Sequence, residues 1–353
     1  MKKIAFFGAK SYDREAFDAA NNGRYEIRYF RTRLAATSVP LAEDCDAVCA
    51  FVNDTVDKEV IEKLVAKGVK LVAMRCAGYN NVDIEAAFDT GMTVVRVPAY
   101  SPYAVAEHAA ALLLTLNRHI HKAAARTRDY NFSLNGLTGF DLHGKTAGII
   151  GAGKIGRIFA DIMKGFGMKV LAYDAFPNPA SGLEYCELDR IFAECDVVSL
   201  HCPLTPDSHH LINRETLRKM KPNAILINTS RGGLIDSEAL LHALRRGYIG
   251  GAGLDVYEEE GDWFYDDHSD ALSQNKVLSL LVAMPNVIIT SHQAFLTREA
   301  LANIASTTLG NLDAFFADAP LENEICYCCH DGKTTMPTNC AKRLTGRCDH
   351  KRC

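Results

Sequence analysis

Short apolar runs alternate with longer segments in which apolar residues recur every three or four positions. Runs of the first kind are typical of buried strands, and segments of the second kind are typical of amphipathic helices. Before residue 100 the pattern predicts helices over 12–20 and 56–67, and strands over 3–8, 25–30, 47–52, 71–76 and 93–98. This alternation is typical of a parallel sheet covered by helices, so we expect one α/β unit here.

A long Ala- and Leu-rich segment separates this series from a second one. Ser101 can cap a helix and Pro102 suits its first turn, so the segment predicts one helix from Ser101 to about Arg126. Its length and apolar character suggest packing on several neighbours, with a second subunit among the candidates. The later pattern predicts helices over 188–194, 214–220 and 237–246, and strands over 197–202, 224–229, 251–256 and 286–291. A final amphipathic helix over 297–316 is expected to return to the first unit.

The most specific pattern opens the second series. The apolar run 146–150 ends in Gly151-Ala152-Gly153-Lys154-Ile155-Gly156 and passes into a helical pattern. In such a strand–turn–helix, the first glycine allows the tight turn, the second lets a pyrophosphate approach, and the third lets helix and strand pack closely. A second strand then ends at Asp174, eighteen positions after Gly156. A carboxylate there can bind the ribose hydroxyls of NAD and would repel the 2′-phosphate of NADP, so the segment predicts an NAD site.

Composition narrows the class of protein. The 353 residues allow about two domains, and the net charge of −4 shows no basic excess for nucleic acid. No apolar run is long enough to cross a membrane. The apolar start is interrupted by Lys10 and no cleavage site follows, which favours a first strand over a signal peptide. We therefore expect a cytoplasmic enzyme with a small-molecule substrate and no nucleic-acid or membrane partner.

Four further segments carry a resemblance to a known family. The segment 219–236, KMKPNAILINTSRGGLID, resembles the D-isomer-specific 2-hydroxyacid dehydrogenases, and among them the D-lactate dehydrogenases. The segments HCPLT at 201–205, GLDVY at 253–257 and SHQAF at 291–295 agree, and the resemblance runs to about Glu324. It implies two doubly wound, Rossmann-like α/β domains with the active site in the cleft between them. The substrate domain would comprise 1–100 plus 297–325, and the NAD-binding domain 101–296.

The family's catalytic trio corresponds to Arg231, Glu260 and His292. A guanidinium can hold the carboxylate of a 2-keto acid with two hydrogen bonds and polarise the neighbouring carbonyl. An imidazole can give or take a proton near neutrality, and an adjacent carboxylate favours its protonated form. The resemblance thus implies that Arg231 binds substrate, His292 is the acid–base and Glu260 supports it.

The resemblance also implies the binding residues. Expected substrate contacts are Phe51, Ala77, Gly78, Tyr100 and Arg231, although Phe51 and Tyr100 read equally well as core aromatics. A bulky Phe51 would suit a small substrate methyl group. Expected cofactor contacts are Gly151, Gly153, Lys154, Ile155, Gly156, Asp174, Cys202, Pro203, Ser208, Thr229, Ser230 and Asp255. No metal ligand is expected among the site residues.

Three functions remain open on the sequence. The first is an NAD-dependent D-lactate dehydrogenase that reduces pyruvate, forming a homo-oligomer. The second is a broader D-2-hydroxyacid dehydrogenase that acts on larger 2-keto acids. The third, of a different class, is an NAD-sensing corepressor-like binding protein, which shares the fold.

The last segment, 326–353, lacks the resemblance. It holds six of the twelve cysteines, has little apolar content and carries a basic excess. Such a segment cannot bury a core, which favours a disordered extension. Cys326, Cys329, His330, Cys340 and Cys348 leave a zinc or redox site as the alternative. Cys326 and Cys329 have the spacing of a ligand pair, although the second pair is irregular. Catalysis is expected not to need this tail.

Overall fold

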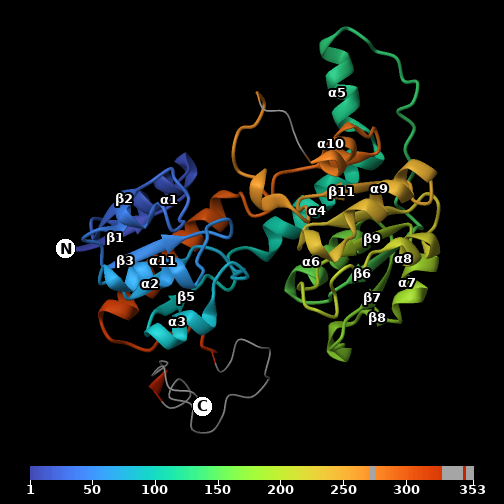
Figure 1. The fold of residues 1–353 in the computed structure, drawn as a ribbon. Coiled ribbons are helices and arrows are strands. Elements are labelled where there is room, and N and C mark those ends of the chain that lie inside the picture. The colour runs from blue at the N-terminus through green and yellow to red at the C-terminus, as the bar shows by residue number, and fades with distance from the viewer. Residues whose placement is uncertain (271–274, 328–344, 347–353) are drawn as a thin grey trace. The chain divides into compact units, whose positions relative to one another are not determined.

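The computed structural model describes residues 1–270, 275–327 and 345–346. The chain divides into two compact units (Figure 1). Unit 1 holds Met1–Ser101 and the described residues from Thr297 onward, and unit 2 is Pro102–Leu296. Each unit is a parallel sheet with flanking helices, which confirms the predicted α/β class with two Rossmann-like sheets.

Unit 1 is built on a five-stranded parallel sheet of order β2-β1-β3-β4-β5. The strands are β1 (Lys2–Phe6), β2 (Tyr25–Tyr29), β3 (Ala47–Ala50), β4 (Leu71–Met74) and β5 (Thr93–Val95). The helices are α1 (Ser11–Asn21), α2 (Lys58–Ala66), α3 (Ile84–Thr90) and α11 (Arg298–Phe316). Every residue of β3 and β4 is buried, as expected for central strands covered on both faces.

Helix α11 joins unit 1 although it lies far along the chain. It packs on α1, and the Tyr25 hydroxyl donates a 2.6 Å hydrogen bond to Asp313. The chain continues beyond it to Ile325, whose N–H donates to the Val94 carbonyl at 2.8 Å.

Unit 2 contains a seven-stranded parallel sheet of order β12-β11-β10-β9-β6-β7-β8. Its strands are β6 (Thr146–Ile150), β7 (Lys169–Tyr173), β8 (Glu184–Tyr185), β9 (Val197–Leu200), β10 (Ile225–Asn228), β11 (Gly251–Leu254) and β12 (Val287–Ile289). Its helices are α4 (Pro102–Asn117), α5 (Ile120–Arg128), α6 (Lys154–Gly165), α7 (Leu188–Glu194), α8 (Arg214–Lys219), α9 (Ser237–Arg246) and α10 (Lys276–Ala283). The order reverses between β6 and β9, which is where doubly wound sheets bind dinucleotides.

Alternate residues of the central strand β10 enter separate cores. Ile225 and Ile227 pack with residues of α4 and α6. Leu226, between them, packs with residues of α7, α8 and α9 on the other face. Helices therefore cover both faces of this sheet, and its functional groups gather at the carboxyl ends of the strands.

The single helix expected from Ser101 to about Arg126 is wrong in one respect, because the chain breaks into α4 and α5. His119 adopts the left-handed conformation with φ 50°, and the Asn117 side chain exchanges two hydrogen bonds with the backbone of Phe140. The apolar pattern ends at Leu116, and none of the residues of α5 is buried. Figure 1 shows α5 projecting from the rest of unit 2.

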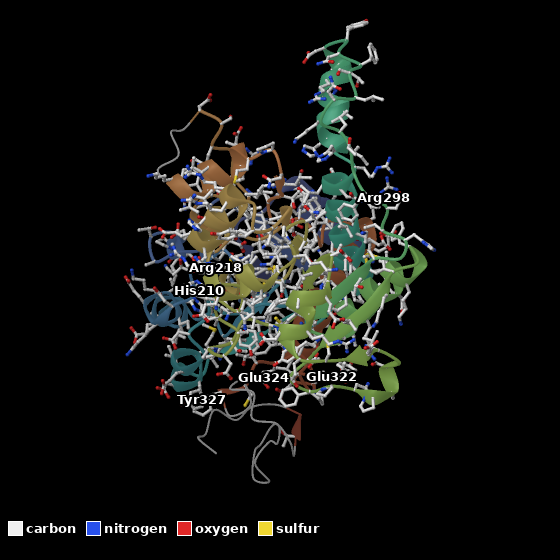
Figure 2. All side chains as sticks on the ribbon, turned by 90° about the vertical axis from the view of Figure 1, so that its right-hand side faces the viewer. His210, Arg218, Arg298, Glu322, Glu324 and Tyr327 are labelled. Carbon is white, nitrogen blue, oxygen red and sulfur yellow. The ribbon has the colours of Figure 1, made fainter. Side chains whose placement is uncertain are left out.

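The first two residues of the tail, which the sequence favours as a disordered extension, pack against unit 1. Cys326 is buried, and the Tyr327 ring (labelled in Figure 2) lies 5.0 Å from that of Phe88. Apolar contacts with α3 thus extend the fold to Tyr327. The other candidate zinc or redox ligands, Cys329, His330, Cys340 and Cys348, lie outside the described residues. No helix in the described part of the chain is both long and apolar enough to cross a membrane.

Candidate active site

The glycine-rich loop joins β6 to α6 as the sequence predicts. Gly151 has φ 95°, and a Cβ there would lie 2.4 Å from the Cys202 backbone nitrogen, so a side chain is excluded. A Cβ on Gly156 would lie 2.0 Å from the Gly151 carbonyl oxygen. A Cβ on Gly153 would meet nothing within 4 Å, which leaves open space before the N-terminus of α6, where Lys154 and Ile155 form the first turn. The loop thus has the shape and the free N–H groups of a pyrophosphate site.

Asp174 follows β7 and is held against this loop. Its carboxylate accepts hydrogen bonds from the N–H of Ala152 at 2.7 Å and of Phe176 at 2.9 Å. These contacts fix the carboxylate beside the glycine turn, where a ribose would lie.

The segments after β9 and β10 meet next to the glycine loop. The Ser230 hydroxyl donates to the Cys202 carbonyl at 2.6 Å, and Ser208 closes the turn after Pro203 by donating to the Pro203 carbonyl at 2.8 Å. Thr229 Oγ1 is buried and has no hydrogen-bond partner among the described residues. A buried hydroxyl without a partner costs free energy, so a ligand atom is the expected acceptor or donor here.

Arg231 extends from the loop after β10. One of its terminal nitrogens donates to the Ser230 carbonyl at 2.7 Å, and its carbonyl accepts from the Asn228 side chain at 2.8 Å. The next residue, Gly232, packs so closely on the loop after β11 that a Cβ would lie 2.1 Å from the Tyr257 carbonyl carbon. This contact places the arginine loop against the segment that carries Glu260.

Glu260 and His292 form a hydrogen-bonded pair. His292 Nδ1 lies 2.7 Å from Glu260 Oε1, and Glu260 Oε2 accepts the N–H of Tyr257 at 3.0 Å. The side chain of His292 is 14% exposed and that of Glu260 is 19% exposed, so the pair is largely buried but accessible to a ligand. Because Nδ1 faces the carboxylate, Nε2 is the ring nitrogen left to face a substrate.

Asp255 organises the backbone that carries His292. Its fully buried carboxylate accepts the Thr290 hydroxyl at 2.5 Å and the N–H groups of Gln293 at 2.9 Å and Ala294 at 2.8 Å. The Asp255 carbonyl also accepts the N–H of His292 at 2.7 Å. These bonds hold His292 in the left-handed region with φ 49°, which non-glycine residues seldom adopt.

His108 supports the same network from α4. Its Nε2 lies 3.0 Å from Thr290 Oγ1 and 3.3 Å from Asp255 Oδ1. Burial raises the pKa of Asp255, but the hydrogen bonds from His108, Thr290 and the backbone outweigh it, so the pKa lies below its usual value. The sequence pattern did not reveal His108, because a histidine within an apolar helix carries no sign of its partner.

Two other titratable groups at this edge, His201 and Cys202, do not change their charge near neutral pH. Burial lowers the pKa of His201 to about 3, so its imidazole is neutral and bonds Ser199 at 2.9 Å. Burial raises the pKa of the Cys202 thiol to about 11, so it stays protonated. Neither His201 nor Cys202 is therefore set up to exchange a proton near neutrality.

The substrate contacts expected from unit 1 lie after β3, β4 and β5. Phe51 is 9% exposed, and its ring lies 4.7 Å from the buried guanidinium of Arg75. The carbonyls of Ala77 and Gly78 accept hydrogen bonds from Arg96 and Cys76, whereas their N–H groups have no acceptor within the described ranges. Two adjacent N–H groups without acceptors suit a carboxylate. Tyr100 is half-buried, and its carbonyl accepts from Asn303 at 2.7 Å.

Comparison of the sequence with known proteins identifies the family to which the chain belongs. Residues 110–294 match the family model described as the NAD binding domain of D-isomer specific 2-hydroxyacid dehydrogenases. The chain belongs to this family. It is 51% identical over 314 residues to a 2-hydroxyacid dehydrogenase homolog of Haemophilus influenzae, covering 88% of this chain and 95% of the relative. It is 49% identical over 327 residues to the D-lactate dehydrogenase of Escherichia coli, covering 92% and 99%.

The fold also matches that of a solved structure. The pyruvate reductase of Chlamydomonas reinhardtii superposes with a TM-score of 0.87 at 43% identity, covering 92% of this chain and 98% of that one. The chain is thus an NAD-dependent 2-hydroxyacid dehydrogenase, as the resemblance implied. The open space at Gly153, the fixed Asp174 carboxylate and the unpartnered Thr229 hydroxyl all fit NAD.

Proposed function

We propose that this chain reduces pyruvate to D-lactate with NADH and that His292 donates the proton. The observation that carries the proposal is the His292–Glu260 pair, 2.7 Å apart, with Glu260 on the loop that packs against the Arg231 loop. The names of the relatives from Escherichia coli and Chlamydomonas reinhardtii support the choice of pyruvate.

Each side chain of the trio has a distinct task in this proposal. The Arg231 guanidinium binds the substrate carboxylate and polarises the keto oxygen. NADH, when bound, supplies the hydride that reaches the keto carbon. His292 Nε2 gives its proton to the oxygen that gains negative charge, and Glu260 stabilises the positive charge of the ring while it is protonated.

Unit 1 supplies the substrate's remaining contacts in this proposal. The N–H groups of Ala77 and Gly78 bind the carboxylate as well. The Phe51 ring restricts the space for the substrate's side chain to about that of a methyl group. Tyr100 is retained as a further contact.

A panel of 2-keto acids tests the substrate. NADH oxidation, followed by absorbance, is expected to be fastest with pyruvate and to fall for branched or aromatic 2-keto acids. Faster turnover of the larger acids would assign the broader dehydrogenase activity instead. No oxidation with any member would favour a role in NAD-dependent binding.

Phe51→Ala sharpens this test. If the ring limits side-chain size, the variant gains kcat/KM for larger 2-keto acids relative to pyruvate. Tyr29→Phe on β2, which keeps the ring and lies outside the proposed substrate contacts, is the control and is expected to leave the ranking unchanged. An unaltered ranking in Phe51→Ala would remove Phe51 from the substrate site.

We also propose that the chain forms a homo-oligomer through α5 and the segment after it. Tyr130, Phe132 and Leu134 are 86%, 69% and 80% exposed, and α5 projects from unit 2 (Figure 1). Clustered exposed apolar residues on a projecting segment are typical of a subunit interface. Sedimentation equilibrium of a Phe132→Asp, Leu134→Asp variant is expected to show dissociation, whereas Val282→Asp on α10 is the control. A monomeric wild-type protein would contradict this assignment.

A cytoplasmic location completes the proposal. Seven cysteines in the described part of the chain are free thiols, which suits a reducing compartment. Cell fractionation with an antibody against the chain tests it, and recovery in a secreted or membrane fraction would contradict it.

A further inference from the structure

A cluster of three metal-ligating side chains lies outside the groups used above. His209, His210 and Glu258 each present a ligand atom, and these atoms lie within 4.8 Å of one another. His210 Nε2 is 2.5 Å from Glu258 Oε1, and the rings of His209 and His210 stack with centroids 3.9 Å apart. His210 is labelled in Figure 2.

Backbone conformation brings the two histidines onto one side. Consecutive side chains of an extended segment point in opposite directions. His210 instead has φ 51°, in the left-handed region, so that the two rings stack. This conformation is fixed because the N–H of His210 donates to the Gly233 carbonyl at 2.9 Å. The pair is therefore held in place by the loop after β10.

Glu258 reaches the histidines from a different loop. It follows β11 and comes two residues before Glu260, whose carboxylate faces His292 instead. Hence the two acids of one short loop serve separate histidines. Since the side chains of His210 and Glu258 are 35% and 29% exposed, solvent reaches the cluster and can complete a coordination shell.

We propose that His209, His210 and Glu258 bind one divalent transition-metal ion of the zinc, cobalt, nickel and copper group. Two imidazoles and a carboxylate match the ligand preference of these ions, whereas magnesium and calcium prefer oxygen alone. Bonds of about 2.0–2.2 Å place ligand atoms roughly 3–4 Å apart. Rotation of the exposed His209 side chain reaches that spacing, and the ion replaces the proton between His210 and Glu258.

Titration of the full-length protein with Co²⁺ tests this site. Co²⁺ bound to nitrogen and oxygen ligands of a protein gives absorption bands in the visible range, which the titration follows. Cobalt bound to the tail cysteines would add a sulfur-to-metal charge-transfer band in the near ultraviolet. We expect visible cobalt bands that saturate at one equivalent of Co²⁺, whether or not the charge-transfer band is present. Added Zn²⁺ is expected to abolish these visible bands by competing for the site. Charge-transfer absorbance alone, or no visible band, would overturn the proposal.

Single substitutions locate the ion. His209→Ala is expected to weaken binding about tenfold or more, the size of effect seen when groups around a bound metal are lost. Its side chain is exposed, so folding is not at risk, and circular dichroism verifies this. His210→Ala and Glu258→Gln are expected to weaken binding at least as much. His242→Ala on α9 is the matched control, and equal affinity in His209→Ala, His210→Ala and wild type would refute the site.

Discussion

Replacing Asp255 by Asn tests the network that positions His292. The Asp255 carboxylate accepts hydrogen bonds from Thr290 and Gln293 on one oxygen and from Ala294 on the other. An amide retains one accepting oxygen, and its NH₂ group would then face the N–H of a backbone donor. One charge-assisted hydrogen bond is lost and a buried donor is left unsatisfied.

The expected loss of stability follows from these contacts. A hydrogen bond to a charged group contributes about 1.5–3 kcal/mol, and an unsatisfied buried donor costs about 1–3 kcal/mol. Since the two effects overlap, we expect Asp255→Asn to lower the free energy of unfolding by about 2–4 kcal/mol. Turnover is expected to fall as well, because the backbone that holds His292 is no longer fixed.

The loss of unfolding free energy in Asp255→Asn is expected to be smaller at acidic pH than at neutral pH. The pKa of Asp255 is below its usual value in the folded chain, so its contribution is fully present above the unfolded pKa of about 3.9. It is lost as the pH falls through the lower folded pKa. The difference between wild type and variant is therefore expected to be constant near neutrality and to shrink below about pH 4.

Urea denaturation followed by far-ultraviolet circular dichroism measures these differences. Asp236→Asn is the control in the same unit, because Asp236 caps α9 with one hydrogen bond to Ala239 at 2.9 Å. Asn caps helices about as well as Asp, so the control should shift the unfolding free energy by less than about 0.5 kcal/mol. Equal stability of Asp255→Asn and wild type at pH 7 would refute the reasoning.

Four further predictions concern the cofactor, two residues of the trio and the tail. The Asp174 carboxylate should give a higher kcat/KM with NADH than with NADPH, and equal values would contradict its role. His292→Ala should lower kcat by about 10²–10⁴ with NADH affinity nearly unchanged, as fluorescence titration measures. Arg231→Lys should chiefly raise KM for pyruvate, because Lys cannot form the two-pronged contact; wild-type kinetics in either variant would remove that residue from the mechanism. Truncation after Tyr327 should leave kcat and KM unchanged, and lost activity would show that the tail takes part.

Much of the fold could be predicted because local pattern and tertiary structure agree. Gly151 has a positive φ of 95°, and a Cβ on Gly156 would lie 2.0 Å from the Gly151 carbonyl oxygen, so local geometry alone requires glycine at both positions. Buried strands such as β3 and β4 are almost wholly apolar, as central parallel strands must be. These features led to the α/β class and NAD, and the segment 219–236 with its companions led to the family; all three are confirmed.

What the sequence did not reveal depends on contacts between distant segments. The break between α4 and α5 rests on Asn117 pairing with Phe140, which no helical period encodes. His108, Thr290 and Asp255 come from three separate segments of the chain and meet only in the folded structure. The side chains of His209 and His210 lie on the same side of the chain because His210 adopts the left-handed conformation. This conformation is hard to predict from sequence for a residue other than glycine.

The chirality of the product tests the central claim most directly. The purified chain would be supplied with pyruvate and NADH, and the lactate formed would be resolved by chiral chromatography. A D-specific dehydrogenase that uses Arg231 and His292 as proposed yields D-lactate alone. L-lactate, a racemic product or no lactate would contradict the account.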